Sequence, residues 1–103
     1  MDSKYGILFV RLFGELTRRT RKKFNNEVCK LLEKVGIKNV VFNLENVYKM
    51  DDDGFKTLFK CYEVCLKNNG NSYICLSKNK FGYDLKDFNV VCDELSAYHL
   101  INT

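Results

Sequence analysis

The sequence has no proline, a single histidine and no long apolar run, and each of these absences excludes a class of protein. Without Pro-, Gly- or Ser-rich tracts nothing indicates a linker or a disordered segment, and no internal repeat divides the chain. The longest apolar stretch near the N-terminus, Ile7 to Val10, is far shorter than the roughly 20 residues of a membrane-spanning helix. No signal-peptide pattern surrounds it. We therefore expect one cytoplasmic domain over residues 1–103.

The composition is typical of a compact globular protein, with 46% hydrophobic and 29% charged residues. A net charge of +4 is too modest to indicate nucleic-acid binding by itself. The five cysteines lack CxxC spacing and, with one histidine, form no zinc pattern. Cys61 and Cys65 share a helical face and could meet. We favour buried, reduced cysteines that act as small hydrophobic residues.

The first third of the chain predicts a strand followed by a helix. Residues 6–16, GILFVRLFGEL, are rich in Ile, Val, Leu and Phe, which indicates a mostly buried strand that ends near Gly14. Apolar residues at the spacing of one helical face then predict a helix of about four turns. Thr17 or Thr20 is its expected N-cap, and Gly36 is its expected stop.

A second strand, a second helix and a third strand follow. The β-branched and aromatic run IKNVVFNL predicts a strand over residues 37–44. Apolar residues at helical spacing between Phe55 and Leu66 predict a helix, closed by Asn68-Asn69-Gly70. SYICLS predicts the third strand over residues 72–77.

The last part of the chain carries a weaker pattern. Phe81, Leu85 and Phe88 indicate a short helix, and residues 90–103 could form a strand, a helix or both. Alternating strands and helices predict an α/β fold, in which helices pack on a largely parallel sheet of about four strands. Functional residues in such folds lie beyond the carboxyl ends of the strands, where Asp51 to Gly54 are expected.

Three consecutive aspartates, Asp51, Asp52 and Asp53, open the second helix. Free backbone NH groups and the positive end of the helix dipole favour carboxylates there, so helix capping alone accounts for the run. Adjacent residues entering a helix point in different directions, which argues against a magnesium site. A phospho-aspartate receiver would carry paired acids after its first strand, where Glu15-Leu16-Thr17 stand instead. We expect no metal, no cofactor and no enzymatic activity.

A basic segment precedes the first helix. Its cations are Arg18, Arg19, Arg21, Lys22 and Lys23. They could attract the phosphates of nucleic acid or of anionic lipid, and such binding is the alternative function. No interleaved aromatic residues indicate a stacking platform for bases. We therefore favour a solvated face or an electrostatic match to an acidic protein partner.

The order of elements and several motifs resemble the STAS domain (sulphate transporter and anti-sigma factor antagonist). The resemblance is closest to the small bacterial anti-sigma factor antagonists and covers about Gly6 to Ile101. It rests on ILFVRLFGEL, on Thr20 at the first helix, on IKNVVFNLENVYKM before the aspartates and on Gly70 before a strand. The family motif D-S-S-G reads Asp51-Asp52-Asp53-Gly54 in this sequence. Short ends indicate that the family's first edge strand is truncated or missing and that its C-terminal helix is cut.

The resemblance implies a protein-interaction module in bacterial partner switching, with an anti-sigma factor kinase or a related protein as its partner. In such antagonists the kinase phosphorylates the first serine of the motif, and only the unphosphorylated form binds the kinase and frees the sigma factor. Asp52 stands in the place of that serine and offers no hydroxyl group. Either Asp52 mimics the phosphorylated state and prevents binding, or the partner surface has adapted to it and binding is constitutive.

The resemblance also implies where the partner binds. The expected contact residues are Asp51, Asp52, Asp53, Gly54, Phe55, Lys56 and Thr57. Gly54 would permit close backbone approach, and Phe55 could equally belong to the core. Thr57 is an alternative phosphorylation site, although an ordinary helical threonine is the favoured interpretation. The oligomeric state is left open.

Overall fold

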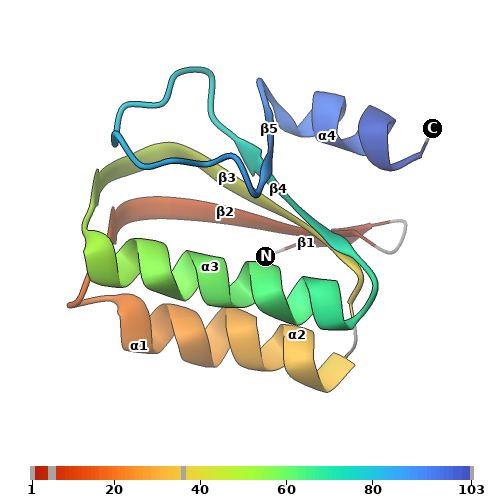
Figure 1. The fold of residues 1–103 in the computed structure, drawn as a ribbon, viewed down its shortest axis with the longest axis horizontal. Helices are drawn as coiled ribbons and strands as arrows, with labels where there is room; N and C mark the ends of the chain where they lie inside the picture. Colours follow the sequence, from red (N-terminus) through yellow and green to blue (C-terminus); the bar gives the residue numbers. More distant parts are fainter. Residues whose placement is uncertain (1, 5–6, 36, 103) are drawn as a thin grey trace.

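The computed structural model describes residues 2–4, 7–35 and 37–102. Figure 1 shows a twisted sheet with helices on both faces. In chain order the elements are β1 (Asp2–Lys4), β2 (Ile7–Leu16), α1 (Arg21–Phe24), η1 (Asn25–Cys29, a π-helical turn), α2 (Lys30–Val35), β3 (Asn39–Met50), α3 (Asp52–Lys67), β4 (Asn71–Cys75), β5 (Asn89–Val91) and α4 (Glu94–Ile101).

In the described part of the chain, the sheet has five strands in the order β1-β2-β3-β4-β5. Strands β2 to β5 pair in parallel, and the three-residue β1 pairs antiparallel with β2. The predicted α/β fold with a largely parallel sheet is therefore confirmed. Two strand-helix-strand units place the carboxyl ends of β2 and β3 side by side, because the register joins Leu16 to Met50.

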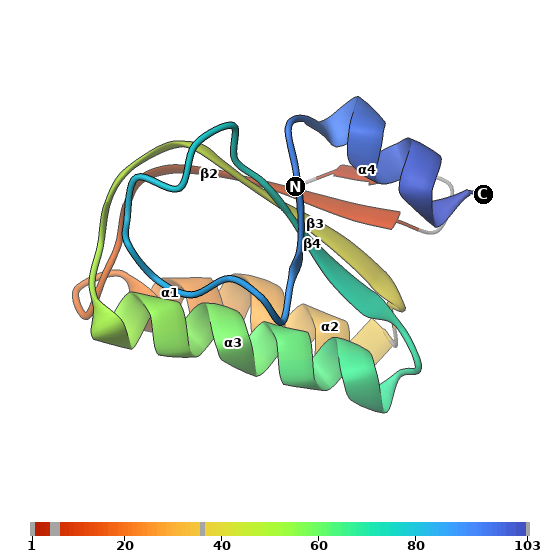
Figure 2. The same cartoon turned by 45° about the horizontal axis from the view of Figure 1, so that its top comes forward.

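Two hydrophobic clusters hold the layers together. The helical rod formed by α1, η1 and α2 lies beside α3 on one face, and α4 covers part of the other (Figures 1 and 2). Along β2, Leu8 and Val10 belong to the larger cluster under the rod and α3. Ile7 and Phe9 belong to the smaller cluster with Ala97 of α4. Both faces of the strand are buried from Ile7 to Val10, which explains the apolar run there.

The first strand does not stop at its glycine, and the second strand is longer than predicted. Gly14 does not end the first strand, because β2 continues to Leu16. Gly14 instead adopts a φ of +86° beside a shift in the register with β3. Glycine accepts this left-handed backbone without strain, so the strand passes through an irregularity and goes on. β3 likewise runs beyond Leu44 to Met50, since its polar second half still pairs with β2.

The short helix predicted from Phe81, Leu85 and Phe88 is wrong. The described chain between β4 and β5 contains turns and irregular structure but no helix. Leu85 and Phe88 are buried, and the ring of Phe88 contacts Phe59 and Tyr62 of α3. Their helical spacing thus reflects a loop that packs its apolar side chains onto a neighbouring helix. The final segment forms both a strand and a helix, as one of the alternatives allowed.

The predicted helix boundaries agree with the structure where residues are described. Thr20 is the N-cap of α1. The predicted stop at Gly36 lies outside the described residues. Asn68 is the C-cap of α3, and Asn69 follows with a φ of +60°. The NH of Gly70 donates to the carbonyl of Cys65, which completes the predicted end of this helix.

A disulfide joins the two helices that lie side by side. It links Cys29 of η1 to Cys61 of α3, whose Cα atoms are 5.3 Å apart. The expectation that the cysteines are reduced is therefore wrong for this pair. The two residues are 32 positions apart in sequence, and only the packing of the helices brings them within disulfide range. Cys65 does not pair with Cys61 and remains a buried free thiol.

We predict that unfolded, unreduced protein titrates three thiols, those of Cys65, Cys75 and Cys92, and that reduction raises the number to the five cysteines of the sequence. Because the disulfide closes a long loop, reduction is expected to lower the free energy of unfolding by about 2–4 kcal/mol. Urea unfolding with and without a phosphine reductant measures this change. The Cys29→Ala/Cys61→Ala variant is the control and should not respond to reductant. Five thiols without reduction would contradict the disulfide.

Candidate functional site

The three aspartates lie where the end of β3 meets the start of α3, beside the end of β2. The NH of Asp51 donates to the carbonyl of Leu16 at 3.4 Å, so the two strand ends are joined there. Gly54 allows this approach. A Cβ atom at Gly54 would lie 1.8 Å from the Leu16 carbonyl oxygen, far inside any tolerated contact. A glycine is therefore required for the first turn of α3 to lie against β2.

Asp51 holds the loop together through its side chain. One carboxylate oxygen accepts from the NH of Gly54 at 2.8 Å, which caps α3. The other accepts from the NH of Arg18 at 3.0 Å, in the segment that follows β2. These backbone hydrogen bonds, that from Arg18 first, lower the pKa of Asp51. Asp51 therefore has a structural role between two segments distant in sequence.

Asp53 faces the first helix. Its carboxylate accepts from the Arg21 guanidinium at 3.1 Å. Both side chains are partly exposed, so the ion pair contributes at most about 1 kcal/mol. The backbone carbonyl of Asp53 also accepts from the Thr57 hydroxyl at 2.9 Å. The pair thus connects the basic segment to the aspartate run, which sequence reasoning treated as two separate sites.

Asp52 is exposed and faces the long loop between β4 and β5. Its carboxylate accepts from the hydroxyl of Tyr83 at 2.7 Å. This hydrogen bond, with desolvation and the negative charge of Asp52 as further causes, raises the pKa of Tyr83 to about 12. The Tyr83 ring also stacks on Phe55, with ring centres 4.7 Å apart and planes within 8°. Sequence reasoning missed Tyr83, because no local pattern relates it to a residue 31 positions away.

The remaining residues of the expected contact surface differ in exposure. Phe55 is half-buried under Tyr83, whereas Lys56 is exposed and Thr57 is half-buried. Phe55 therefore belongs to the contact between α3 and the loop.

The three aspartate side chains accept hydrogen bonds from different partners and do not converge on one point. Across residues 2–4, 7–35 and 37–102, no group of three or more His, Cys, Asp or Glu side chains could hold a metal ion.

The basic segment lies directly beside the aspartates. Arg18 contributes its NH to Asp51, and Arg21 pairs with Asp53. The side chains of Arg19, Lys22 and Lys23 are exposed. Acidic and basic groups thus lie next to each other on the surface.

No helix in the described ranges has the length and apolar character needed to span a bilayer.

Comparison with known proteins identifies similarities in sequence. The STAS domain family matches residues 1–81. An anti-sigma F factor antagonist of Paenibacillus polymyxa is 25% identical over 75 residues, which cover 73% of this chain. The match covers 64% of that protein's own length, so the chain spans less than two thirds of this curated relative.

Solved structures share the fold at lower identity. The anti-sigma factor antagonist SpoIIAA in its unphosphorylated form has a TM-score of 0.81 and 13% identity, covering 99% of this chain and 94% of that one. A sulfate transporter family protein from Wolinella succinogenes has a TM-score of 0.73 and 15% identity, covering 100% of this chain and 93% of that one. At these identities the similarity establishes the shared fold.

Replacing Gly54 with alanine is expected to lower the free energy of unfolding by about 2–3 kcal/mol, because the added methyl group meets backbone atoms that cannot move aside. Urea unfolding followed by circular dichroism measures the loss. Lys56→Ala, at an exposed position of the same helix, is the matched control and should change stability by no more than about 0.5 kcal/mol. Equal losses in the two variants would contradict the close approach.

Asp52→Asn is expected to lower the pKa of Tyr83 from about 12 toward its ordinary value of 10.0. The raised pKa means that the hydrogen bond stabilises the folded protein fully below the unfolded pKa and is lost as pH rises through the folded pKa. The wild type should therefore be more stable than Asp52→Asn at neutral pH, and the difference should shrink in strong base. Tyrosinate absorbance follows the titration, and Tyr83→Phe identifies its component. An unchanged titration in Asp52→Asn would contradict the contact.

Proposed function

The chain belongs to the STAS domain family, and on this basis we propose that it is a non-enzymatic protein-interaction module that binds an anti-sigma factor kinase or a related protein. The Paenibacillus polymyxa relative is named as an anti-sigma F factor antagonist, which supports a role of this kind. We further propose that residues 1–103 act as a single cytoplasmic domain and that Asp51 to Thr57 form the contact surface.

The contact between Asp52 and Tyr83 carries the proposal of constitutive binding. A phosphoserine would bring a charge of roughly −1.5 to −2 and three acceptor oxygens, whereas Asp52 brings about −1. One of its two oxygens already accepts from Tyr83. Asp52 is thus a weak mimic of phosphoserine. Its carboxylate is better described as part of a defined surface with Tyr83 and Phe55, to which a partner can be matched. Binding is then independent of phosphorylation at residue 52.

Two further observations support this interpretation. The hydroxyl of Thr57 donates to the carbonyl of Asp53 within the helix, which favours a structural role over that of a phosphate acceptor. The basic segment lies beside three aspartates, one of which engages Arg21. A nucleic-acid backbone or an anionic membrane would meet these carboxylates as like charges. The arrangement therefore favours a protein partner that carries charges of both signs.

The test is calorimetric titration of the anti-sigma kinase encoded nearest to this protein with the wild type, Asp52→Ser and Asp52→Ala. We expect the wild type to bind in the presence and absence of ATP. Asp52→Ser should bind without ATP and be released once it is phosphorylated, because the switch hydroxyl has been restored. Lys67→Ala, at an exposed position near the far end of α3, is the control and should bind like the wild type.

Two results would contradict parts of this proposal. If only Asp52→Ser or Asp52→Ala binds, Asp52 prevents association and constitutive binding is wrong. If no variant binds, the kinase is not the partner. In that case salt-dependent binding to polyanions through Arg18 to Lys23 becomes the function to measure.

A further inference from the structure

A groove lies between the first helix and α3, which run side by side in Figures 1 and 2. It has a volume of about 340 Å³ and is lined by Arg21, Lys22, Asn25, Thr57 and Lys60. Three of these residues are cations and two are neutral, so among the described residues that line the groove there is no carboxylate. The groove therefore gathers positive charge from two elements that are distant in sequence.

Lys60 reaches across the groove from α3 to the first helix. Its ammonium donates to the side-chain carbonyl of Asn25 at 3.1 Å. An ammonium carries three N–H donors, so this hydrogen bond leaves two for a ligand. The disulfide between Cys29 and Cys61 joins the two walls next to this contact, since Cys61 directly follows Lys60. Groups that are held in place before binding lose less entropy when a ligand associates.

Arg21 and Lys22 provide the other two cations. The Arg21 guanidinium carries five N–H donors, and Asp53 accepts from one of its nitrogens. Neither Lys22 nor Lys60 has a carboxylate within ion-pair distance among the described residues. The hydroxyl of Thr57 donates to the carbonyl of Asp53, so it offers the groove only lone pairs. The donors of the three cations thus dominate the polar groups of the groove.

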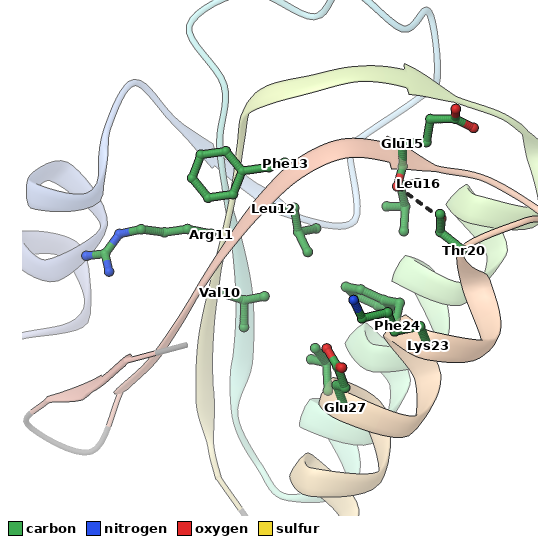
Figure 3. A pocket seen from close by; sticks show the side chains of 11 residues that line it. Val10, Arg11, Leu12, Phe13, Glu15, Leu16, Thr20, Lys23, Phe24 and Glu27 are labelled. Atoms are coloured by element: carbon green, nitrogen blue, oxygen red, sulfur yellow. Dashed lines mark hydrogen bonds between the residues drawn. The ribbon is translucent and has the colours of Figure 1, made fainter.

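A second cavity beside the first helix has different charges. It lies between that helix and β2, and its lining includes the carboxylates of Glu15 and Glu27 as well as the cations of Arg11 and Lys23 (Figure 3). Mixed charges of this kind do not select the sign of a ligand. Compared with this cavity, the groove at α3 favours an anion, because its charges have one sign.

We propose that the groove binds a compact phosphate group, which accepts from Arg21, Lys22 and Lys60. A phosphate monoester carries roughly −1.5 to −2 charges and three acceptor oxygens, which matches cations that approach from two helices. A carboxylate offers one charge and two oxygens. A long polyanion fits less well, because its flanking charges would meet Asp53, which pairs with Arg21 beside the groove.

The test follows the NMR signals of the isotope-labelled protein while inorganic phosphate is added at slightly alkaline pH, where phosphate is a dianion. Sodium chloride keeps the ionic strength constant throughout. We expect saturable shifts at Arg21, Lys22, Asn25 and Lys60. Sodium acetate is the control for a carboxylate and should bind about fivefold more weakly, because it brings less charge and fewer acceptors.

A charge-reversal pair separates the groove from general electrostatics. Lys60→Glu should weaken phosphate binding about tenfold, because an attractive contact becomes repulsive. Lys67→Glu makes the same change in net charge at an exposed position on the same helix, about 10 Å further along its axis. It should weaken binding by less than twofold, since salt screens a charge at that distance. Circular dichroism checks that both variants are folded.

Two further probes identify the source of the phosphate group. Glucose 6-phosphate represents a free metabolite, and a capped tripeptide with a central phosphoserine represents a phosphorylated protein. Tighter binding of one probe than of inorganic phosphate assigns the groove to that source. Equal binding of all three means that the groove recognises the phosphate group alone.

Three results would overturn the inference. They are shifts that chloride alone reproduces, equal weakening by Lys60→Glu and Lys67→Glu, and no saturable shifts at millimolar phosphate. Tighter binding of a single-stranded oligonucleotide, with shifts centred on Arg18 and Arg19, would assign the cations to a polyanion instead. The calorimetric test of kinase binding does not depend on this groove, so either proposal can fail without the other.

Discussion

The first turn of α3 touches the backbone at the end of β2, and this contact positions every group of the candidate site. A side chain at Gly54 would overlap the Leu16 carbonyl. Asp51 reinforces the contact by accepting from Gly54 on one side and from Arg18 on the other. Because the two segments are joined in this way, the aspartates and the basic residues become neighbours. Without this contact the aspartates and the basic residues would lie in two separate charged loops, where solvent and salt would screen their charges more strongly.

At this contact between α3 and β2, each aspartate has a different physical role. Asp51 satisfies backbone donors, Asp53 pairs with Arg21, and Asp52 engages the hydroxyl of Tyr83. Of these contacts, only that of Asp52 involves the long loop after β4. The ring of Tyr83 in that loop also stacks on Phe55. The negative charge of Asp52 is thus built into a contact between α3 and this loop. A binding surface with such preorganised groups loses less entropy when a partner associates.

Periodicity and turn residues in the sequence determined the order of elements, the largely parallel sheet and the position of the aspartates at a helix start, because these depend on neighbours within a few positions. Tertiary structure alone decided the contacts between distant positions. Cys29 bonds to Cys61, the Tyr83 hydroxyl donates to Asp52, and Phe88 packs on α3 from an irregular loop. Such pairings depend on how the helices and loops pack on the sheet. The apolar residues of the loop have helical spacing, but tertiary packing, and not a helix, accounts for their burial.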